Sequence, residues 1–220
     1  MRPGSRLTAG GLMDAVLIGG WGVTPETMRT ATALLPPGAQ CRFVPPINGC
    51  AEDASNCDLV VGWSFGAWKI LAAAASGVVF RGHVVLLAPF ISFCSDFGLG
   101  GRCSQAQVLW LHRWLKRDPK AALTDFYMRA ELGPSPAGLP YDRESLLEEL
   151  EHMAGDASAE LRAFAARGLP GGWRAVIGAS DRLLDGAAIC RALPGCALAA
   201  DAGHNLESLV AAMKGGNGAF

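Results

Sequence analysis

The sequence is poor in charge and has no long uninterrupted apolar run. Charged residues make up 18 % of the 220 residues, and 19 basic side chains nearly balance 20 acidic ones, which gives a formal net charge of −1. A chain so close to neutral has no global field that would attract nucleic acid or an anionic membrane. No apolar stretch reaches the length of a transmembrane helix. We therefore expect no nucleic-acid partner and no membrane span.

The cysteines lack the spacing of a zinc or redox site. There are seven of them, an odd number, and no two stand in a Cys-x-x-Cys arrangement. Such a set favours reduced thiols in a cytosolic protein, because disulfides are rare in that compartment. The sequence thus predicts a cytoplasmic protein, and nothing in it requires a metal ion or an organic cofactor. We also expect a monomer.

What the chain does have is apolar material for a large core. Hydrophobic residues make up 50 % of it, enough for one domain of this length. Residues 1–12 contain two arginines and several glycines but no sustained apolar stretch, so they do not resemble a signal peptide. We interpret them as a flexible leader, with Met13 as an alternative start. The predicted division is a core of residues 13–89 and 168–220, interrupted by a helical insertion at residues 90–167.

Apolar runs alternate with helical patterns on both sides of that insertion. Thr24 and Pro25 are typical of the start of a helix, here expected to end near Leu35. Residues 48–56 read as a polar connection. Strands alternating with helices at this spacing predict a parallel α/β sheet. The expected strands are residues 14–18, 41–44, 57–61, 83–88, 173–177 and 196–200, and the other expected core helices are residues 67–75, 184–193 and 205–213.

The insertion shows no strand pattern. Its helical stretches are separated by prolines, and its place between two strands of the sheet is the usual position of a lid. The expected helices are residues 104–116, 119–131, 143–153 and 157–166.

The most informative stretch is Gly62-Trp63-Ser64-Phe65-Gly66, which follows an apolar run and precedes a helical pattern. Strand, Gly-x-Ser-x-Gly and helix together are typical of a nucleophile elbow. The turn strains the serine, and strand and helix pass so close that a side chain at position 62 or 66 would clash. A chance match is the alternative, since the chain contains 28 glycines.

A nucleophilic serine needs a base, and the base needs an orienting carboxylate. Ser64, Asp181 and His204 occur in the chain order of α/β-hydrolases, and each follows an expected strand. Parallel strands place their carboxyl ends at one edge, so these side chains should meet there. We therefore predict the α/β-hydrolase fold and this catalytic triad.

Rival residues exist for two of these roles. Asp181 is also a plausible helix cap, and Asp185 or Asp201 would then be the carboxylate. The other histidines are weaker candidates for the base: one begins an expected strand, and two lie within expected helices (His83, His112 and His152).

The oxyanion that forms during acyl transfer needs backbone donors. The first is expected to be the N–H of Phe65, at the start of the helix after the serine. The second is expected from Gly19-Gly20-Trp21-Gly22, which follows the first strand, with the Trp21 N–H as the candidate. A simple tight turn is the alternative for these glycines.

Taken together, these motifs resemble the pimeloyl-acyl carrier protein methyl ester esterases of biotin synthesis (BioH/BioG type). The matching segments are Gly-Trp-Gly after the first strand, Gly-Trp-Ser-Phe-Gly at the elbow, Gly-Ala-Ser-Asp and Ala-Gly-His. They cover about residues 15–88 and 175–204. Two departures concern the oxyanion loop, where Gly19 replaces a frequent histidine, and the insertion, where residues 126–129 match the BioG pattern only loosely.

The resemblance implies a serine carboxylesterase with Ser64, Asp181 and His204 as its triad. The reaction would hydrolyse the methyl ester of a pimeloyl group carried by acyl carrier protein. It would release the free carboxylate and end chain elongation.

A cluster of basic residues in the insertion is consistent with a carrier-protein partner. Helical spacing places Arg113 near Lys116 and Arg117 on one face, and Arg102 and Arg129 would extend it. Acyl carrier proteins are acidic, so a basic surface would steer one toward the site. An ordinary solvated face is the alternative, and the opposite, apolar face packs on the core or lines an acyl channel. The four expected contact residues are Arg113, Lys116, Arg117 and Lys120, and the apolar face comprises Trp110, Leu111, Trp114 and Leu115.

Two other functions remain open. A triad on this fold also serves lipases and thioesterases acting on other acyl chains. A catalytically silent hydrolase fold that binds a ligand or partner is the second alternative.

Overall fold

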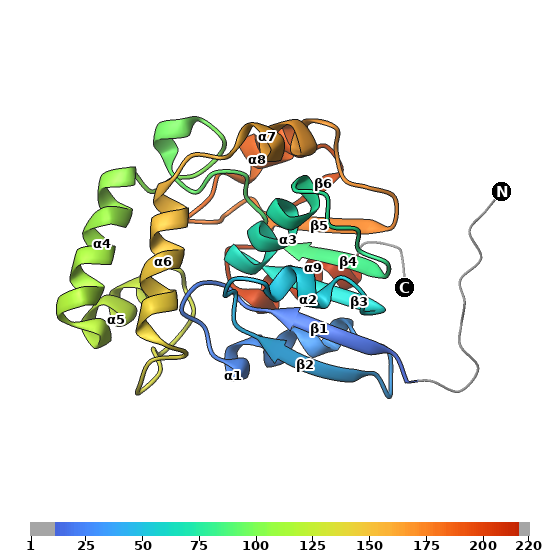
Figure 1. Ribbon diagram of the computed structural model, residues 1–220, viewed down its shortest axis with the longest axis horizontal. Helices are drawn as coiled ribbons and strands as arrows, with labels where there is room; N and C mark the ends of the chain where they lie inside the picture. Colours follow the sequence, from blue (N-terminus) through green and yellow to red (C-terminus); the bar gives the residue numbers. More distant parts are fainter. Residues whose placement is uncertain (1–11, 216–220) are drawn as a thin grey trace.

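The computed structural model describes residues 12–215, so nearly all of the expected leader, residues 1–12, lies outside the described residues. Six parallel strands form one sheet in the order β2-β1-β3-β4-β5-β6 (Figure 1). This is the parallel α/β sheet that the sequence predicts. The strands are β1 (Asp14–Ile18), β2 (Gln40–Val44), β3 (Leu59–Trp63), β4 (His83–Leu87), β5 (Trp173–Gly178) and β6 (Cys196–Ala199).

The direction of the strand order changes between β1 and β3. From β1 the chain passes outward to β2, returns across β1 to form β3, and then continues outward on the other side. Ile18 and Gly62 are register partners there, so the carboxyl ends of the two strands lie side by side. Ligands of open α/β sheets bind at such a point, beyond the carboxyl ends of the strands.

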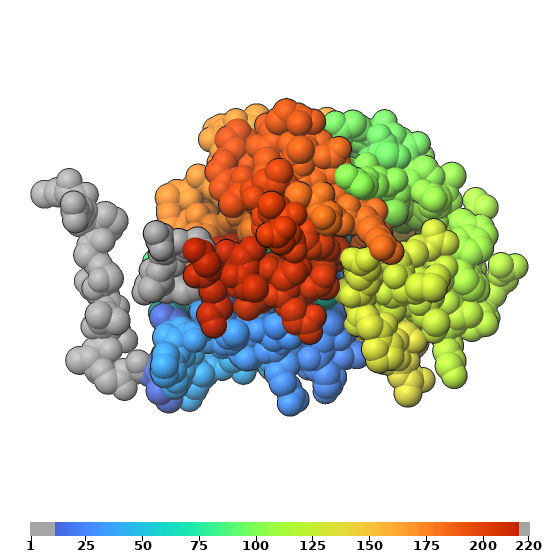
Figure 2. Space-filling model, turned by 180° about the vertical axis from the view of Figure 1, so that it is seen from behind, coloured from blue at the N-terminus to red at the C-terminus, as the bar shows by residue number. Residues whose placement is uncertain are grey.

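Alternating side chains of the strands build two cores. Val16, Val60 and Val84 belong to the core under α2 (Cys50–Ala54), α3 (Phe65–Ala75) and α7 (Ala159–Ala166). Leu17 and Val61 belong to the core on the opposite face. That face is covered by η1, a 3-10 helix (Arg29–Leu34), and α9 (Leu206–Gly215), which pack against each other. Figure 2 shows α9 in red beside the blue N-terminal segments. α8 (Gly186–Ala192) packs on β5 and β6.

Three helices between β4 and β5 form a group beside the carboxyl ends of the strands (Figure 1). Helix α4 (Gln105–Arg117) packs on α5 (Pro119–Arg129) and on α6 (Arg143–Ala154). Each begins at a capping side chain, provided by Ser104, Asp118 and Asp142. The last helix of the expected insertion, α7, instead packs beside α3 on the sheet. A short 3-10 helix, η2 (Ser95–Phe97), precedes α4.

Two local expectations differ from the structure. The connection expected at residues 48–56 contains helix α2, whose three buried side chains, Cys50, Ala51 and Ala54, face the sheet. A helix of five residues is too short to show a periodic pattern. The helix expected from Pro25 to Leu35 is α-helical only in α1 (Pro25–Met28) and continues as η1. There the Thr32 hydroxyl donates to the Arg29 carbonyl (2.7 Å), a local bond that competes with regular helix.

All seven cysteines lie within the described residues and are free thiols. Across residues 12–215 the helices are too short or too polar to cross a bilayer.

Candidate active site

Ser64 stands at the junction of β3 and α3 in a strained conformation, with φ 54° and ψ −117°. The two glycines around it allow this turn. A Cβ at position 62 would lie 2.8 Å from the Ala67 Cα, and one at position 66 would lie 2.4 Å from the Ile18 carbonyl oxygen. Both contacts are closer than real Cβ atoms allow, and both meet backbone that cannot move aside. These two backbone contacts are therefore the reason why a side chain at position 62 or 66 would clash, as the sequence predicts.

The structure brings Ser64, Asp181 and His204 together in one buried line. His204 Nε2 lies 3.1 Å from Ser64 Oγ, and His204 Nδ1 lies 2.7 Å from Asp181 Oδ2. Asp181 is fully buried, and the other two residues are nearly so. Asp181 Oδ2 accepts a hydrogen bond from the Nδ1–H of His204, and the Nε2 of the same ring faces the serine hydroxyl.

The two neighbouring aspartates have separate roles. Asp181 Oδ1 accepts the amides of Leu183 (2.8 Å) and Leu184 (3.0 Å), which fixes the carboxylate while Oδ2 faces the histidine. Asp185 accepts the Ala188 amide (2.9 Å) and caps helix α8. Asp201 is exposed. Asp181 is thus the one of these three whose carboxylate contacts the imidazole.

The remaining histidines lie elsewhere. His83 begins β4, so it lies at the amino-terminal end of the strands, away from the serine. His112 faces Glu151, with 3.1 Å between its Nε2 and Oε1, and His152 stacks obliquely on Trp68.

A contact that sequence reasoning missed holds His204 in place. The Trp63 indole N–H donates to the His204 carbonyl (3.2 Å), and the two rings lie 5.9 Å apart. Trp63 occupies a variable position of Gly-x-Ser-x-Gly, so the pattern itself gave no signal for this role.

The loop after β1 runs beside the serine. A Cβ at Gly20 would lie 3.2 Å from the Ser64 Cβ and 3.8 Å from its Oγ. Within residues 12–215, the amides of Trp21 and Phe65 have no hydrogen-bond acceptor. Both N–H groups therefore keep the capacity that an oxyanion donor needs.

Three hydrogen bonds tie this loop to the helical insertion. Trp21 donates its indole N–H to the Leu146 carbonyl (2.9 Å). Gly22 donates its amide to the Tyr141 hydroxyl (2.9 Å) and accepts at its carbonyl from the Tyr127 hydroxyl (2.8 Å). Sequence reasoning missed these residues because they lie more than 100 positions from the loop.

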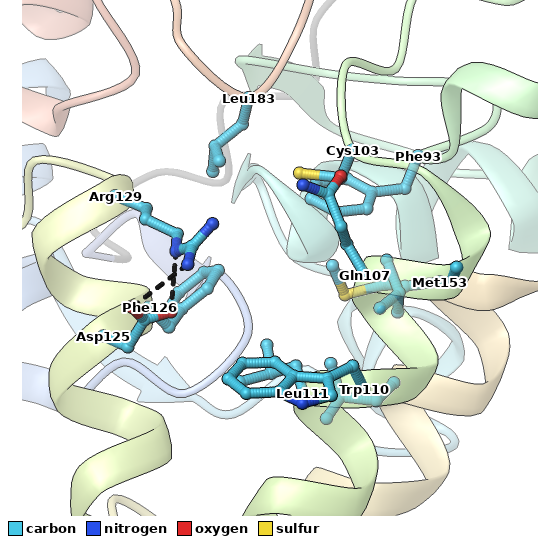
Figure 3. Close-up of a pocket in the computed structure, with 13 residues that line it drawn as sticks. Phe93, Cys103, Gln107, Trp110, Leu111, Asp125, Phe126, Arg129, Met153 and Leu183 are labelled. Carbon is cyan, nitrogen blue, oxygen red and sulfur yellow. Dashed lines mark hydrogen bonds and ion pairs between the residues drawn. The ribbon is translucent and has the colours of Figure 1, made fainter.

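An apolar cavity of about 400 Å³ lies among the insertion helices (Figure 3). Trp110 and Leu111 line it, whereas Leu115 is fully buried in the core. Phe126 forms one wall and packs edge-on against Trp21, with 4.6 Å between ring centroids. The cavity therefore lies beside the oxyanion loop, and Ser64 is not among the residues that line it.

The lining also includes one ion pair. Arg129 donates to both carboxylate oxygens of Asp125, at 2.7 and 3.2 Å. Arg129, an expected extension of the basic surface, is thus already paired, unlike the four expected contact residues. Those cations are exposed and make no ion pair within the described residues: Arg113, Lys116, Arg117 and Lys120.

Comparisons with known proteins place most of the chain in one family. Residues 16–212 match the profile of the "Alpha/beta hydrolase family". A solved hydrolase from Pseudomonas aeruginosa is 14 % identical, with a TM-score of 0.66 over 93 % of this chain and 89 % of that one. An enol-lactonase from Burkholderia xenovorans is 16 % identical (TM-score 0.61; 93 % and 90 % covered). The esterase RhEst1 from Rhodococcus is also 16 % identical (TM-score 0.52; 92 % and 89 % covered). No curated protein sequence matches the chain significantly.

Proposed function

The chain belongs to the alpha/beta hydrolase family, and from that premise we propose that it is a serine hydrolase that cleaves a carboxylic ester. One observation carries the proposal: the continuous hydrogen-bonded line from Ser64 Oγ through the His204 ring to the buried Asp181 carboxylate. A serine hydroxyl becomes a useful nucleophile only when an oriented base takes its proton.

The reaction follows from this geometry. His204 Nε2 takes the Ser64 proton as Oγ attacks the ester carbonyl, and Asp181 stabilises the imidazolium that forms. The tetrahedral oxyanion accepts hydrogen bonds from the Trp21 and Phe65 amides. Collapse expels the alcohol, which takes the proton from His204, and leaves an acyl group on Ser64. Water, deprotonated by His204, then releases the acid and restores the serine.

For the substrate we propose the methyl ester of pimeloyl-acyl carrier protein. The motif resemblance supports it, and so do two features of the insertion. A cavity of about 400 Å³ is within the usual range for a small ligand, and its apolar wall suits an acyl chain. Four exposed cations on α4 and at the start of α5 suit an acidic carrier.

The experiment that tests this function compares two esters. Purified protein and the Ser64→Ala variant are assayed with pimeloyl-acyl carrier protein methyl ester and with a short p-nitrophenyl ester. Serine-dependent cleavage of both supports the full proposal. Cleavage of the small ester alone keeps the serine hydrolase and rejects the carrier substrate, in favour of another acyl ester or thioester.

A silent binding protein is the remaining alternative, and a fluorophosphonate probe separates it from an enzyme. The probe labels Ser64 only if the serine is an activated nucleophile. Labelling that is lost in a folded His204→Ala variant would therefore show that His204 activates the serine. Absence of both labelling and turnover in the unchanged protein would reject the hydrolase.

Carrier docking is tested by charge reversal on α4. The double variant Arg113→Glu/Arg117→Glu should lower kcat/KM for the carrier ester about tenfold or more and leave p-nitrophenyl ester cleavage unchanged, because rim charges act mainly on association. Arg81→Glu, an exposed arginine just before the start of β4, is the control for a charge reversal away from this surface. Equal loss on both esters would contradict docking at this surface.

A further inference from the structure

The oxyanion loop is held by the insertion through a buried polar chain that the reaction itself does not use. The Tyr141 hydroxyl accepts the Gly22 amide (2.9 Å) and donates to Glu149 Oε2 in a short hydrogen bond. Glu149 lies on α6 and is 2 % exposed. Burying a carboxyl group this completely costs free energy unless the group is hydrogen-bonded, and Tyr141 supplies that bond. We therefore ask what the Tyr141–Glu149 pair does in the protein.

The position of Gly22 links these hydrogen bonds to the serine site. Gly22 follows Trp21 directly, and its backbone is left-handed, with φ 68°. Its N–H belongs to the peptide group between Trp21 and Gly22, so the bond to Tyr141 holds the backbone on one side of the Trp21 Cα. The Trp21 N–H belongs to the peptide group on the other side of the same Cα, so its freedom to rotate is reduced as well. Trp21 carries the free amide that we assign to the oxyanion, and the residue before it, Gly20, lies against Ser64.

Glu149 in turn fixes Tyr141. The tyrosine hydroxyl has a single proton, and Glu149 Oε2 accepts it, so the lone pair of the hydroxyl points to Gly22. Within residues 12–215, Glu149 Oε1 has no hydrogen-bond partner. Burial raises the pKa of Glu149 to about 8, so the carboxyl is mainly neutral at pH 7 and can remain in this apolar place.

We infer that Tyr141, oriented by Glu149, is a positioning residue that sets the oxyanion donor of Trp21 against Ser64. The inference rests on the proposed function, because it assigns Trp21 its role in ester hydrolysis. The helices beside the strand ends would then tune the rate of the chemical step as well as enclose the acyl chain.

The kinetic test uses the full chain and p-nitrophenyl butyrate. Tyr141→Phe removes only the hydroxyl, and we expect kcat to fall about tenfold or more while KM stays within about twofold, since losing an oxyanion donor outright costs about 100-fold or more. Tyr141 does not line the cavity, so a KM effect is not expected. A change in KM alone, or in neither constant, would overturn the inference.

Glu149 provides a matched series. Glu149→Leu should lower kcat as Tyr141→Phe does, and Glu149→Gln, which keeps an acceptor oxygen, should recover it. Combining Tyr141→Phe with Glu149→Leu should cost little more than either change alone, because the two residues act through one bond. Glu148→Gln, an exposed neighbour on the same helix, is the control. If the losses of kcat in the two single variants add up in the double variant, the two residues act separately. That result would overturn the inference that Glu149 acts through Tyr141.

A second measurement separates this inference from the proposed function. Amide hydrogen exchange of residues 19–24 should accelerate in Tyr141→Phe relative to the unchanged protein, whatever the substrate. If Ser64 is neither labelled nor active, the hydrolase proposal fails while this measurement still decides whether Tyr141 orders the loop. Unchanged protection would overturn the positioning role even in an active enzyme.

Discussion

Replacement of Glu149 by glutamine should change how the stability of the protein depends on pH. Burial, the largest influence, raises the pKa of this carboxyl from 4.5 to about 8, although the Tyr141 hydrogen bond and the nearby Lys69 oppose it. The folded state therefore binds a proton that the unfolded state releases above pH 4.5. The proton bound only by the folded state contributes to the unfolding free energy, and this contribution is lost progressively as the pH rises from about 4.5 to 8.

The size of the effect follows from the two pKa values. A separation of about 3.5 pH units corresponds to about 5 kcal/mol, at about 1.4 kcal/mol for each unit. Glutamine cannot ionise, so Glu149→Gln escapes this loss. The charged and titratable neighbours of Glu149 are the same in the unchanged protein and in the Glu149→Gln variant, so the comparison isolates Glu149. These neighbours are Cys50, Lys69, Tyr141, Asp142 and Glu148.

Urea unfolding between pH 5 and pH 9 measures the difference. The variant should gain stability relative to the unchanged protein as the pH rises, by several kcal/mol overall, with most of the gain complete near pH 8. Glu148→Gln, exposed on the same helix, should run nearly parallel to the unchanged protein. If the stability of Glu149→Gln also follows the same pH dependence as that of the unchanged protein, Glu149 is ionised in the folded protein. The reasoning from its burial is then refuted.

Other substitutions test the serine site. Gly66→Ala should remove Ser64 labelling and lower the melting temperature, because its Cβ would lie 2.4 Å from a backbone oxygen, whereas Gly171→Ala, with nothing within 4 Å, should do neither. Asp181→Asn should lower kcat about 1,000-fold or more by favouring the wrong histidine tautomer, with the fold retained; kinetics and circular dichroism check this. Asp185→Ala should instead cost about 1 kcal/mol of stability through the lost helix cap, with kcat nearly unchanged. Comparable kcat for the Asp181 and Asp185 variants would contradict the assignment of the two carboxylates.

The sequence predicted the sheet and the elbow because their signals are local. The central strands β1, β3 and β4 are short runs that are buried throughout or in all but their first residue, and the elbow needs glycine at two fixed positions around Ser64. The choice between Asp181 and Asp185 stayed open in the sequence because both follow the same strand and both are good caps. Only the fold shows that one caps α8 and the other faces His204.

The support of the oxyanion loop was not predictable in the same way. Tyr141 lies 119 positions from Gly22, and Leu146 lies 125 positions from Trp21. No spacing rule connects such pairs, because their meeting depends on how three insertion helices pack beyond the strand ends. In the sequence Glu149 is one more acidic residue in a charged helical segment, and its burial and its hydrogen bond from Tyr141 distinguish it from Glu148 only in the structure.

The pairing of β4 with β5 across the insertion also has a kinetic consequence. Leu87 and Val176 are neighbours in the sheet, and Ser64 meets a histidine 140 positions further along the chain. Contacts so distant in sequence form slowly, because a long loop must close before they contribute. During synthesis or refolding, the elbow can form well before its base arrives. The return of Ser64 reactivity after dilution from denaturant therefore reports when the second half of the sheet has joined the first.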